Sequence, residues 1–161
     1  MKLLEILEIE HVGPKGEVLW RAEHLTNVLH AEGEEYILTA AFYDEDIIPS
    51  EFYFGCDDRL TLSRTDTMDD VVDEPQINGY ARQVVAYGEF AIETDNGFWG
   101  AVSPILIYTA SGGDWGPVSN LFLTTESGGG GKLIASVPFS QEITVENGTS
   151  LNVRMRIALQ D

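Results

Sequence analysis

The sequence predicts a mainly β protein: an antiparallel β-sandwich or jelly-roll-like domain with one short helix and an N-terminal β-hairpin. After residue 50, short apolar and β-branched segments alternate with turn sequences such as Asp95-Asn96-Gly97 and Asn147-Gly148. This spacing is typical of antiparallel strands joined by short connections. No helical segments alternate with these strands, so the pattern does not favour a parallel sheet built from βαβ units.

The length of 161 residues suits one domain, or one domain with an arm. A chain of this size buries about 68–70% of the surface that its unfolded form exposes, so its core needs no disulfide or structural metal. The lone Cys56 is expected to be a buried, reduced thiol. No run approaches the ~18 apolar residues of a membrane helix, and the N-terminus lacks the features of a signal peptide. We expect a soluble protein made in the cytoplasm, with no membrane partner.

The first 23 residues are predicted to form a hairpin or arm, with the β-sandwich domain at 24–161. Apolar-rich segments at 2–10 and 17–23 flank a Gly-Pro-Lys-Gly turn. Side chains such as Leu4, Ile6 and Trp20 make the arm too apolar to remain uncovered. A terminal strand pairs readily with any open sheet edge, so pairing within the chain and pairing with a neighbouring protein are equally open. Leu4, Ile6 and Trp20 are therefore predicted interface residues.

The strongest helix candidate spans residues 26–42, where apolar side chains recur near the helical period. Thr26 or Asn27 can cap its start. Gly33 is expected to weaken its middle by about 1 kcal/mol relative to alanine. His30 lies beside the apolar stripe and is predicted to be a hydrogen-bonded structural side chain rather than a ligand, because no second ligand accompanies it.

The last predicted strand, residues 151–159, shows the clearest alternation. Its apolar face consists of Leu151, Val153, Met155, Ile157 and Leu159. Burying such a face is worth on the order of 7–15 kcal/mol, which predicts a central place in the core. Arg154 and Arg156 lie on the opposite face of a chain that has only nine basic residues. They are expected to face carboxylates on the neighbouring strand or to contact another chain, so both are predicted interface candidates.

The net charge of −18 argues against nucleic acid as a direct partner. Residues 31–80 alone hold 14 Asp and Glu against Arg59 and Arg64, a balance of −12. Nucleic-acid binding depends on Lys and Arg neutralising phosphates, so this surface would repel DNA or RNA. The acidity is expected either to solvate the exterior or to attract a basic partner surface.

No catalytic, cofactor-binding or metal-binding set is apparent, so the chain is predicted not to be an enzyme. The nearest candidate is an acidic stretch at 57–74, comprising Asp57, Asp58, Asp66, Asp69, Asp70, Asp73 and Glu74. Closely spaced carboxylates can hold calcium, but the spacing of an EF-hand loop is missing. Two of them could also serve as a glycosidase pair, although the sequence does not show them converging on a cleft.

Six motifs occur in order between Asn27 and Leu159: NVLHAEGEEYILTAAF, EFYFGCDD, RTDTM, GDWGPVSNLFL, GGGGKLIASVPFS and ITVENGTSLNVRMRIAL. Their order resembles a broad family of tailed-bacteriophage virion proteins, which includes head decoration or cement proteins and tail-fibre-like or adaptor proteins. The resemblance implies a β-sandwich with a structural role in the virion and no catalytic residues to transfer.

We therefore expect a capsid decoration or cement protein on the outer surface of the virion. Its expected partners are the major capsid protein or neighbouring virion proteins, and further copies of itself, with a trimer favoured. A tail or neck adaptor, or a fibre anchor, is the alternative within the virion. A carbohydrate-binding module is the alternative from another class, with Trp20, Trp99 and Trp115 as stacking platforms. An exposed, coplanar pair of these tryptophans would favour sugar binding.

Overall fold

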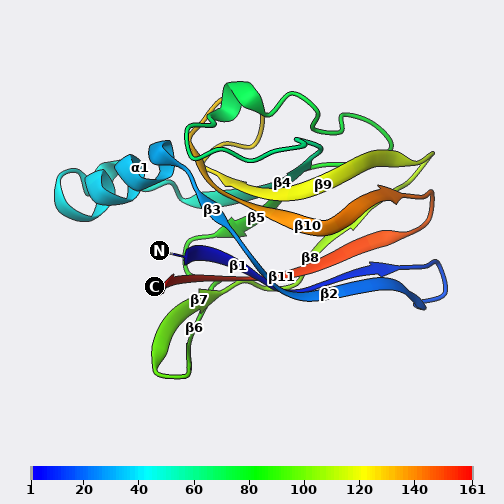
Figure 1. Cartoon of the computed structure of the whole chain (residues 1–161), viewed down its shortest axis with the longest axis horizontal. Coiled ribbons are helices and arrows are strands. Elements are labelled where there is room, and N and C mark those ends of the chain that lie inside the picture. Colours follow the sequence, from blue (N-terminus) through cyan, green and yellow to red (C-terminus); the bar gives the residue numbers. More distant parts are fainter. Residues whose placement is uncertain (1, 161) are drawn as a thin grey trace.

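The computed structural model describes residues 2–160 and consists of two antiparallel β-sheets with an α-helix at one end (Figure 1). The first sheet has the order β2-β1-β11-β7-β6, and β8 also pairs with β11. Its strands are β1 (Lys2–Val12), β2 (Val18–Thr26), β6 (Ala91–Asp95), β7 (Phe98–Val102), β8 (Leu106–Thr109) and β11 (Ser150–Gln160). The predicted mainly β, antiparallel sandwich is confirmed.

The second sheet has the order β3-β10-β9-β4-β5. Its strands are β3 (Val28–Leu29), β4 (Glu51–Asp57), β5 (Gln83–Ala86), β9 (Trp115–Thr124) and β10 (Leu133–Val145). Pro138 lies at a break in the pairing of β10 with β9, as expected for a residue that cannot donate a ladder hydrogen bond. Pro104 separates β7 from β8 for the same reason, and both of these strands pair with β11.

The N-terminal hairpin is part of the sandwich rather than an arm. β1 pairs with β2 on one side and with β11 on the other, so it is an inner strand of the first sheet. The division into a unit at 1–23 and a domain at 24–161 therefore needs correction, because β1 completes the sheet within its own chain. The predicted central place of the last strand is confirmed, since β11 lies between β1 and the pair β7 and β8.

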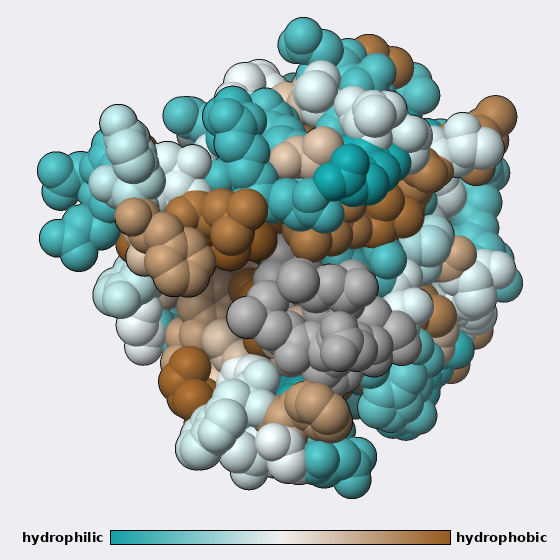
Figure 2. All heavy atoms as spheres, turned by 60° about the vertical axis from the view of Figure 1, so that its left-hand side comes forward, coloured by the Kyte–Doolittle hydropathy of each residue, from teal (hydrophilic) through white to brown (hydrophobic). Residues whose placement is uncertain are grey.

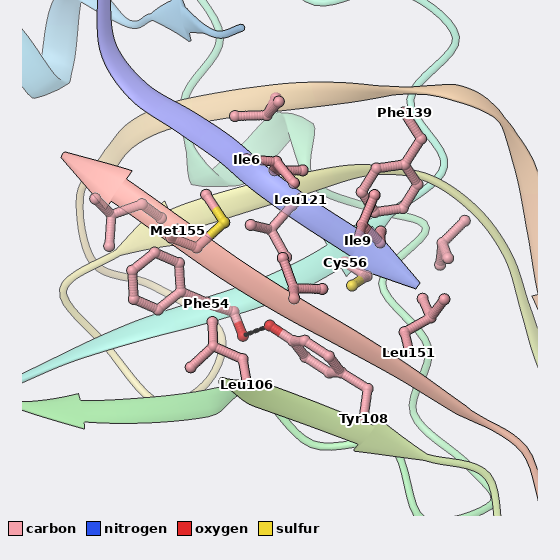
Figure 3. Packing of buried hydrophobic residues seen from close by; sticks show 14 of the residues in the cluster. Ile6, Ile9, Phe54, Cys56, Leu106, Tyr108, Leu121, Phe139, Leu151 and Met155 are labelled. Atoms are coloured by element: carbon pink, nitrogen blue, oxygen red, sulfur yellow. Dashed lines mark hydrogen bonds between the residues drawn. The ribbon is translucent and has the colours of Figure 1, made fainter. Parts of the chain in front are cut away.

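The core lies between the two sheets (Figure 3). Leu151, Val153 and Met155 of β11 are fully buried, as the alternation predicted. Ile157 is only half-buried, and the side chain of Leu159 lies outside the described part. Residues from β4 and β9 face them from the second sheet. Tyr108 of β8 donates a hydrogen bond of 2.8 Å to the carbonyl oxygen of Phe54 in β4, which ties the sheets together. Cys56 is buried, and burial raises the pKa of its thiol, in line with the expected inert thiol.

Helix α1 (Ala31–Phe42) begins five residues later than predicted, because Thr26 ends β2 and residues 28–29 form β3. Its N-cap is His30. Gly33 does not merely weaken the helix: a Cβ at this position would collide with the backbone carbonyl of Ile134 in β10. Glycine therefore lets the helix approach the sheet closely. Two short 3₁₀ helices follow, η1 (Glu45–Ile47) and η2 (Met68–Asp70). Among residues 2–160, no helix is long and apolar enough to cross a membrane.

Candidate interaction surface

The acidic stretch at 57–74 is tied to the second sheet by a buried arginine. Arg59 donates from Nε to Oδ2 of Asp57 at 2.5 Å and from Nη2 to Oδ1 at 3.2 Å. Its Nη1 also donates to Asp66 at 3.2 Å. Burial raises the pKa of Asp57, and the hydrogen bonds and charge of Arg59 oppose that shift. This guanidinium thus balances two of the carboxylates that the sequence grouped as a candidate calcium site.

A second arginine balances the far end of the same stretch. Arg82 donates from Nη2 to Oε2 of Glu74 at 2.7 Å and from Nε to Oε1 at 2.8 Å, and both side chains are almost fully buried. Tyr80 donates to the same carboxylate at 2.9 Å. Within residues 2–160, no three His, Cys, Asp or Glu side chains lie close enough together to hold a metal ion. The calcium hypothesis gains no support from this geometry, whereas Asp58, Asp73 and Glu74 of the stretch do line one hollow.

His30 is the structural histidine that the sequence predicted. It is fully buried, with Nδ1 2.8 Å from the carbonyl oxygen of Ser63 and Nε2 2.8 Å from the hydroxyl of Ser136. A carbonyl oxygen only accepts, so Nδ1 carries the proton and Nε2 accepts from Ser136. The Ser136 oxygen accepts in turn from Arg59 at 2.8 Å. Burial lowers the pKa of His30, and the nearby positive charge of Arg59 acts in the same direction.

The predicted arginine pair is engaged within the sheet. Arg156 is buried and lies opposite Glu5 of β1, with an Nη1–Oε2 distance of 4.0 Å, and it donates to the carbonyl of Phe98 at 2.9 Å. Arg154 is half exposed and forms an ion pair with Glu93 of β6 at 3.6 Å. In the register, Arg156 lies opposite Glu5 and Arg154 opposite Glu8 of the neighbouring strand β1, whereas Glu93 lies two strands away from Arg154. Both arginines therefore have carboxylates within the sheet, the first of the two roles expected from the sequence.

Two of the predicted apolar interface residues belong to the core. Leu4 and Ile6 are fully buried between the sheets, so we correct their assignment: the second sheet of the same chain covers them. Trp20 is half-buried and packs against that core. Sequence alone cannot separate these cases, because an apolar strand face looks the same whether its own chain or another chain covers it.

Several of the exposed apolar side chains lie on or beside the helix that projects from one end of the molecule. We define the helix patch as Leu38, Phe42, Tyr43, Ile48 and Tyr87. Phe42 is 85% exposed and Tyr43 is 90% exposed. Figure 2 looks towards this end and shows brown apolar surface among teal polar side chains. Glu45 and Asp46 line the same shallow hollow as Ile48 and Tyr87, so acidic groups border this patch.

A second exposed apolar group lies on the β6–β7 hairpin, which extends from the same end of the molecule (Figure 1). We define the hairpin patch as Ile92, Trp99, Ala101 and Ile157; the last two are half-buried, and Ile157 belongs to the neighbouring strand β11. Cross-strand pairing puts Ile92 opposite Ala101 and Ala101 opposite Ile157, so these side chains share the face of the sheet that is buried elsewhere. Trp99, two residues from Ala101, lies on that face too. Ile92 is 67% exposed and Trp99 is 70% exposed.

The sequence explains why this hairpin forms. Asn96 and Gly97 both have positive φ, at 50° and 84°, which is the conformation of a two-residue type I′ turn. The turn was recognisable as Asp95-Asn96-Gly97, one of the turn sequences that separate the predicted strands. What the sequence analysis missed is the exposure of the hairpin patch. Its only signal was two adjacent aromatic residues, Phe98 and Trp99, next to the tight turn.

The three tryptophans do not form an exposed stacking pair. Trp115 is 2% exposed and Trp20 is half-buried, so Trp99 alone is widely exposed. The geometry that would favour sugar binding is thus missing among these residues.

No protein-family model matches this chain, and no curated protein is similar to it in sequence.

Proposed function

We propose that this chain is a non-enzymatic structural protein of a tailed-phage virion, and that it decorates or cements the head by binding neighbouring virion proteins. The observation that carries the proposal is the pair of apolar patches at one end of the molecule. Contiguous exposed apolar patches mark protein-binding surfaces. The motifs between Asn27 and Leu159 resemble those of virion proteins, and this resemblance is the reason for proposing the virion as the place of action.

The charge of the chain supports a place on the outside of the shell. A protein of net charge −18 would be repelled by packaged DNA. The proposed partners are the major capsid protein or neighbouring virion proteins, and a homo-oligomer, with a trimer favoured, would suit the symmetry of a shell. The buried charges of Arg59, Asp57 and Asp66 are paired with one another, which is in keeping with a structural role.

The test is the number of copies of this chain in purified virions of the phage that encodes it. A copy number near that of the shell protein supports decoration. A few copies per particle would move the protein to the tail or neck, and absence from the particle would overturn a virion role.

A matched pair of variants connects this test to the surface. Trp99→Ala is expected to weaken incorporation at least tenfold, since a central aromatic contact is worth about 2 kcal/mol or more. Its stability should stay within about 0.5 kcal/mol of the parent, because the side chain is exposed. Leu19→Ala is the control: Leu19 is also exposed, at 49%, but lies on the β1–β2 hairpin at the opposite end. Equal incorporation of the two variants would show that the hairpin patch is not the binding surface.

A further inference from the structure

We infer that strand β6 accepts an extended segment of a partner protein in which basic and apolar residues alternate. This inference rests on the proposed role of the hairpin patch as a binding surface and specifies the chemistry of the partner. β6 is an edge strand: it pairs with β7 on one side, and all five of its residues are exposed. An exposed edge is a template for strand addition, in which backbone hydrogen bonds supply affinity and side chains supply specificity.

The register of the hairpin shows which backbone groups are available. A two-residue turn makes its flanking residues, Asp95 and Phe98, a hydrogen-bonded pair. The pattern alternates along an antiparallel ladder, so Glu93 and Ala91 also bond to β7. The N–H and C=O groups of Ile92 and Thr94 then point away from β7, towards the free edge. An added strand would bond to these two residues.

The two faces of β6 suit different side chains of the partner segment. Partner residues opposite Ile92 and Thr94 would lie on the face of the hairpin patch, beside Trp99, and apolar side chains suit that position. Partner residues opposite Glu93 and Asp95 would lie on the other face, where lysine or arginine would complement the carboxylates. Because successive side chains of a strand point to opposite faces, basic and apolar residues should alternate along the partner segment.

Charge argues for such a partner and against a second copy of this chain. No Lys or Arg occurs between Arg82 and Lys132, while Glu89, Glu93 and Asp95 lie on or beside β6. Arg154 contacts Glu93, but that pair is half exposed and weak. In the antiparallel register that pairs all of β6 with a second copy, Glu93 would lie opposite its own counterpart. Like charges directly opposite each other destabilise a sheet.

The experiment uses the full chain and two labelled peptides of about six residues, the length of a typical strand. In one peptide lysine and valine alternate, and in the other the same residues are grouped in two blocks. Fluorescence anisotropy should show the alternating peptide binding at least about tenfold more tightly than the block peptide. Because composition and charge are identical, general attraction to an acidic protein cannot produce this preference. Equal binding of the two peptides would overturn the inference.

Two test variants and one matched control locate the site. Thr94→Pro removes an N–H that points to the free edge, a position where an edge strand tolerates proline, and it should abolish the preference, whereas Thr94→Ala should retain it. Glu93→Gln with Asp95→Asn leaves the backbone unchanged and should reduce both the preference and its dependence on salt. A preference that survives both changes would contradict the inference. The unfolding midpoint of each variant shows whether the fold is retained.

The outcomes also separate this inference from the proposed function. A peptide preference at β6, together with absence of the chain from virions, would leave the strand acceptor standing and remove the virion role. Abundant chain in virions without any peptide preference would do the reverse. Concentration-dependent self-association that Thr94→Pro abolishes, measured by sedimentation, would identify a second copy as the occupant and overturn the charge argument.

Discussion

The network around Arg59 and the hairpin patch are opposite exceptions to the rule that charged side chains are exposed and apolar ones are buried. The network buries charged side chains, and the hairpin patch exposes apolar ones. In the network, Arg59, Asp57 and Asp66 satisfy one another, and Ser136 links them to His30. In the hairpin patch, Ile92 and Trp99 remain uncovered, and the β6–β7 hairpin extends away from the second sheet (Figure 1).

The two regions differ in whether contacts within the chain account for them. A buried charge is costly unless it is paired, so the completed pairs of the network explain its presence in the core. An exposed apolar group has no such explanation within its own chain. We therefore assign the network a role in stability and the hairpin patch a role in binding.

The largest expected effect is on the network. Arg59→Met keeps much of the side-chain volume but leaves Asp57 buried without its partner, so the free energy of unfolding should fall by about 3–5 kcal/mol. Urea denaturation measures this change. The control is Arg64→Met, since Arg64 pairs with Glu34 on the surface, where loss of an ion pair costs less than about 1 kcal/mol. A similar loss of unfolding free energy in the two variants would contradict a special role for the buried network.

Helix α1 allows an intermediate test, because its N-cap His30 belongs to the buried network and Leu38 lies in the exposed helix patch. Gly33→Ala should destabilise the protein by roughly 1–3 kcal/mol, because the added Cβ meets the backbone of Ile134. Helix propensity alone predicts the opposite sign, a gain of about 1 kcal/mol. Leu38→Ala, in the exposed helix patch, should change stability by less than about 0.5 kcal/mol. Thermal unfolding distinguishes these outcomes, and a stabilised Gly33→Ala variant would refute the close approach of helix and sheet.

The smallest expected effect concerns pH. Burial lowers the pKa of His30 from its ordinary value of 6.5, so in the window below 6.5 the unfolded chain binds a proton that the native state does not. The contribution of His30 to stability is therefore complete above pH 6.5 and is lost as pH falls through the window. His30→Gln should be less stable than the parent at neutral pH, and that difference should shrink on acidification. Urea unfolding at several pH values measures it, and a difference that widens at low pH would contradict the assignment.

Local patterns predicted much of the fold. The alternation along 151–159 predicted a central buried strand, and the Asn96-Gly97 turn predicted the β6–β7 hairpin. His30 was expected to be structural because no second ligand lay near it in the sequence. These predictions rest on side-chain periodicity, turn conformation and residue chemistry, all of which depend on neighbouring residues in the chain.

Only the tertiary structure decided which apolar faces are covered and which charges are paired. Leu4 and Trp99 both lie in apolar strands, but Leu4 is buried in the core between the sheets whereas Trp99 is 70% exposed. Gly33 appeared to weaken a helix until the backbone of Ile134 was found beside it. Arg59 gathers Asp57, Asp66 and Ser136, and Ser136 lies 77 residues further along the chain. Burial and pairing depend on contacts between distant segments, so residue pattern determined the elements and long-range packing determined the interaction surface.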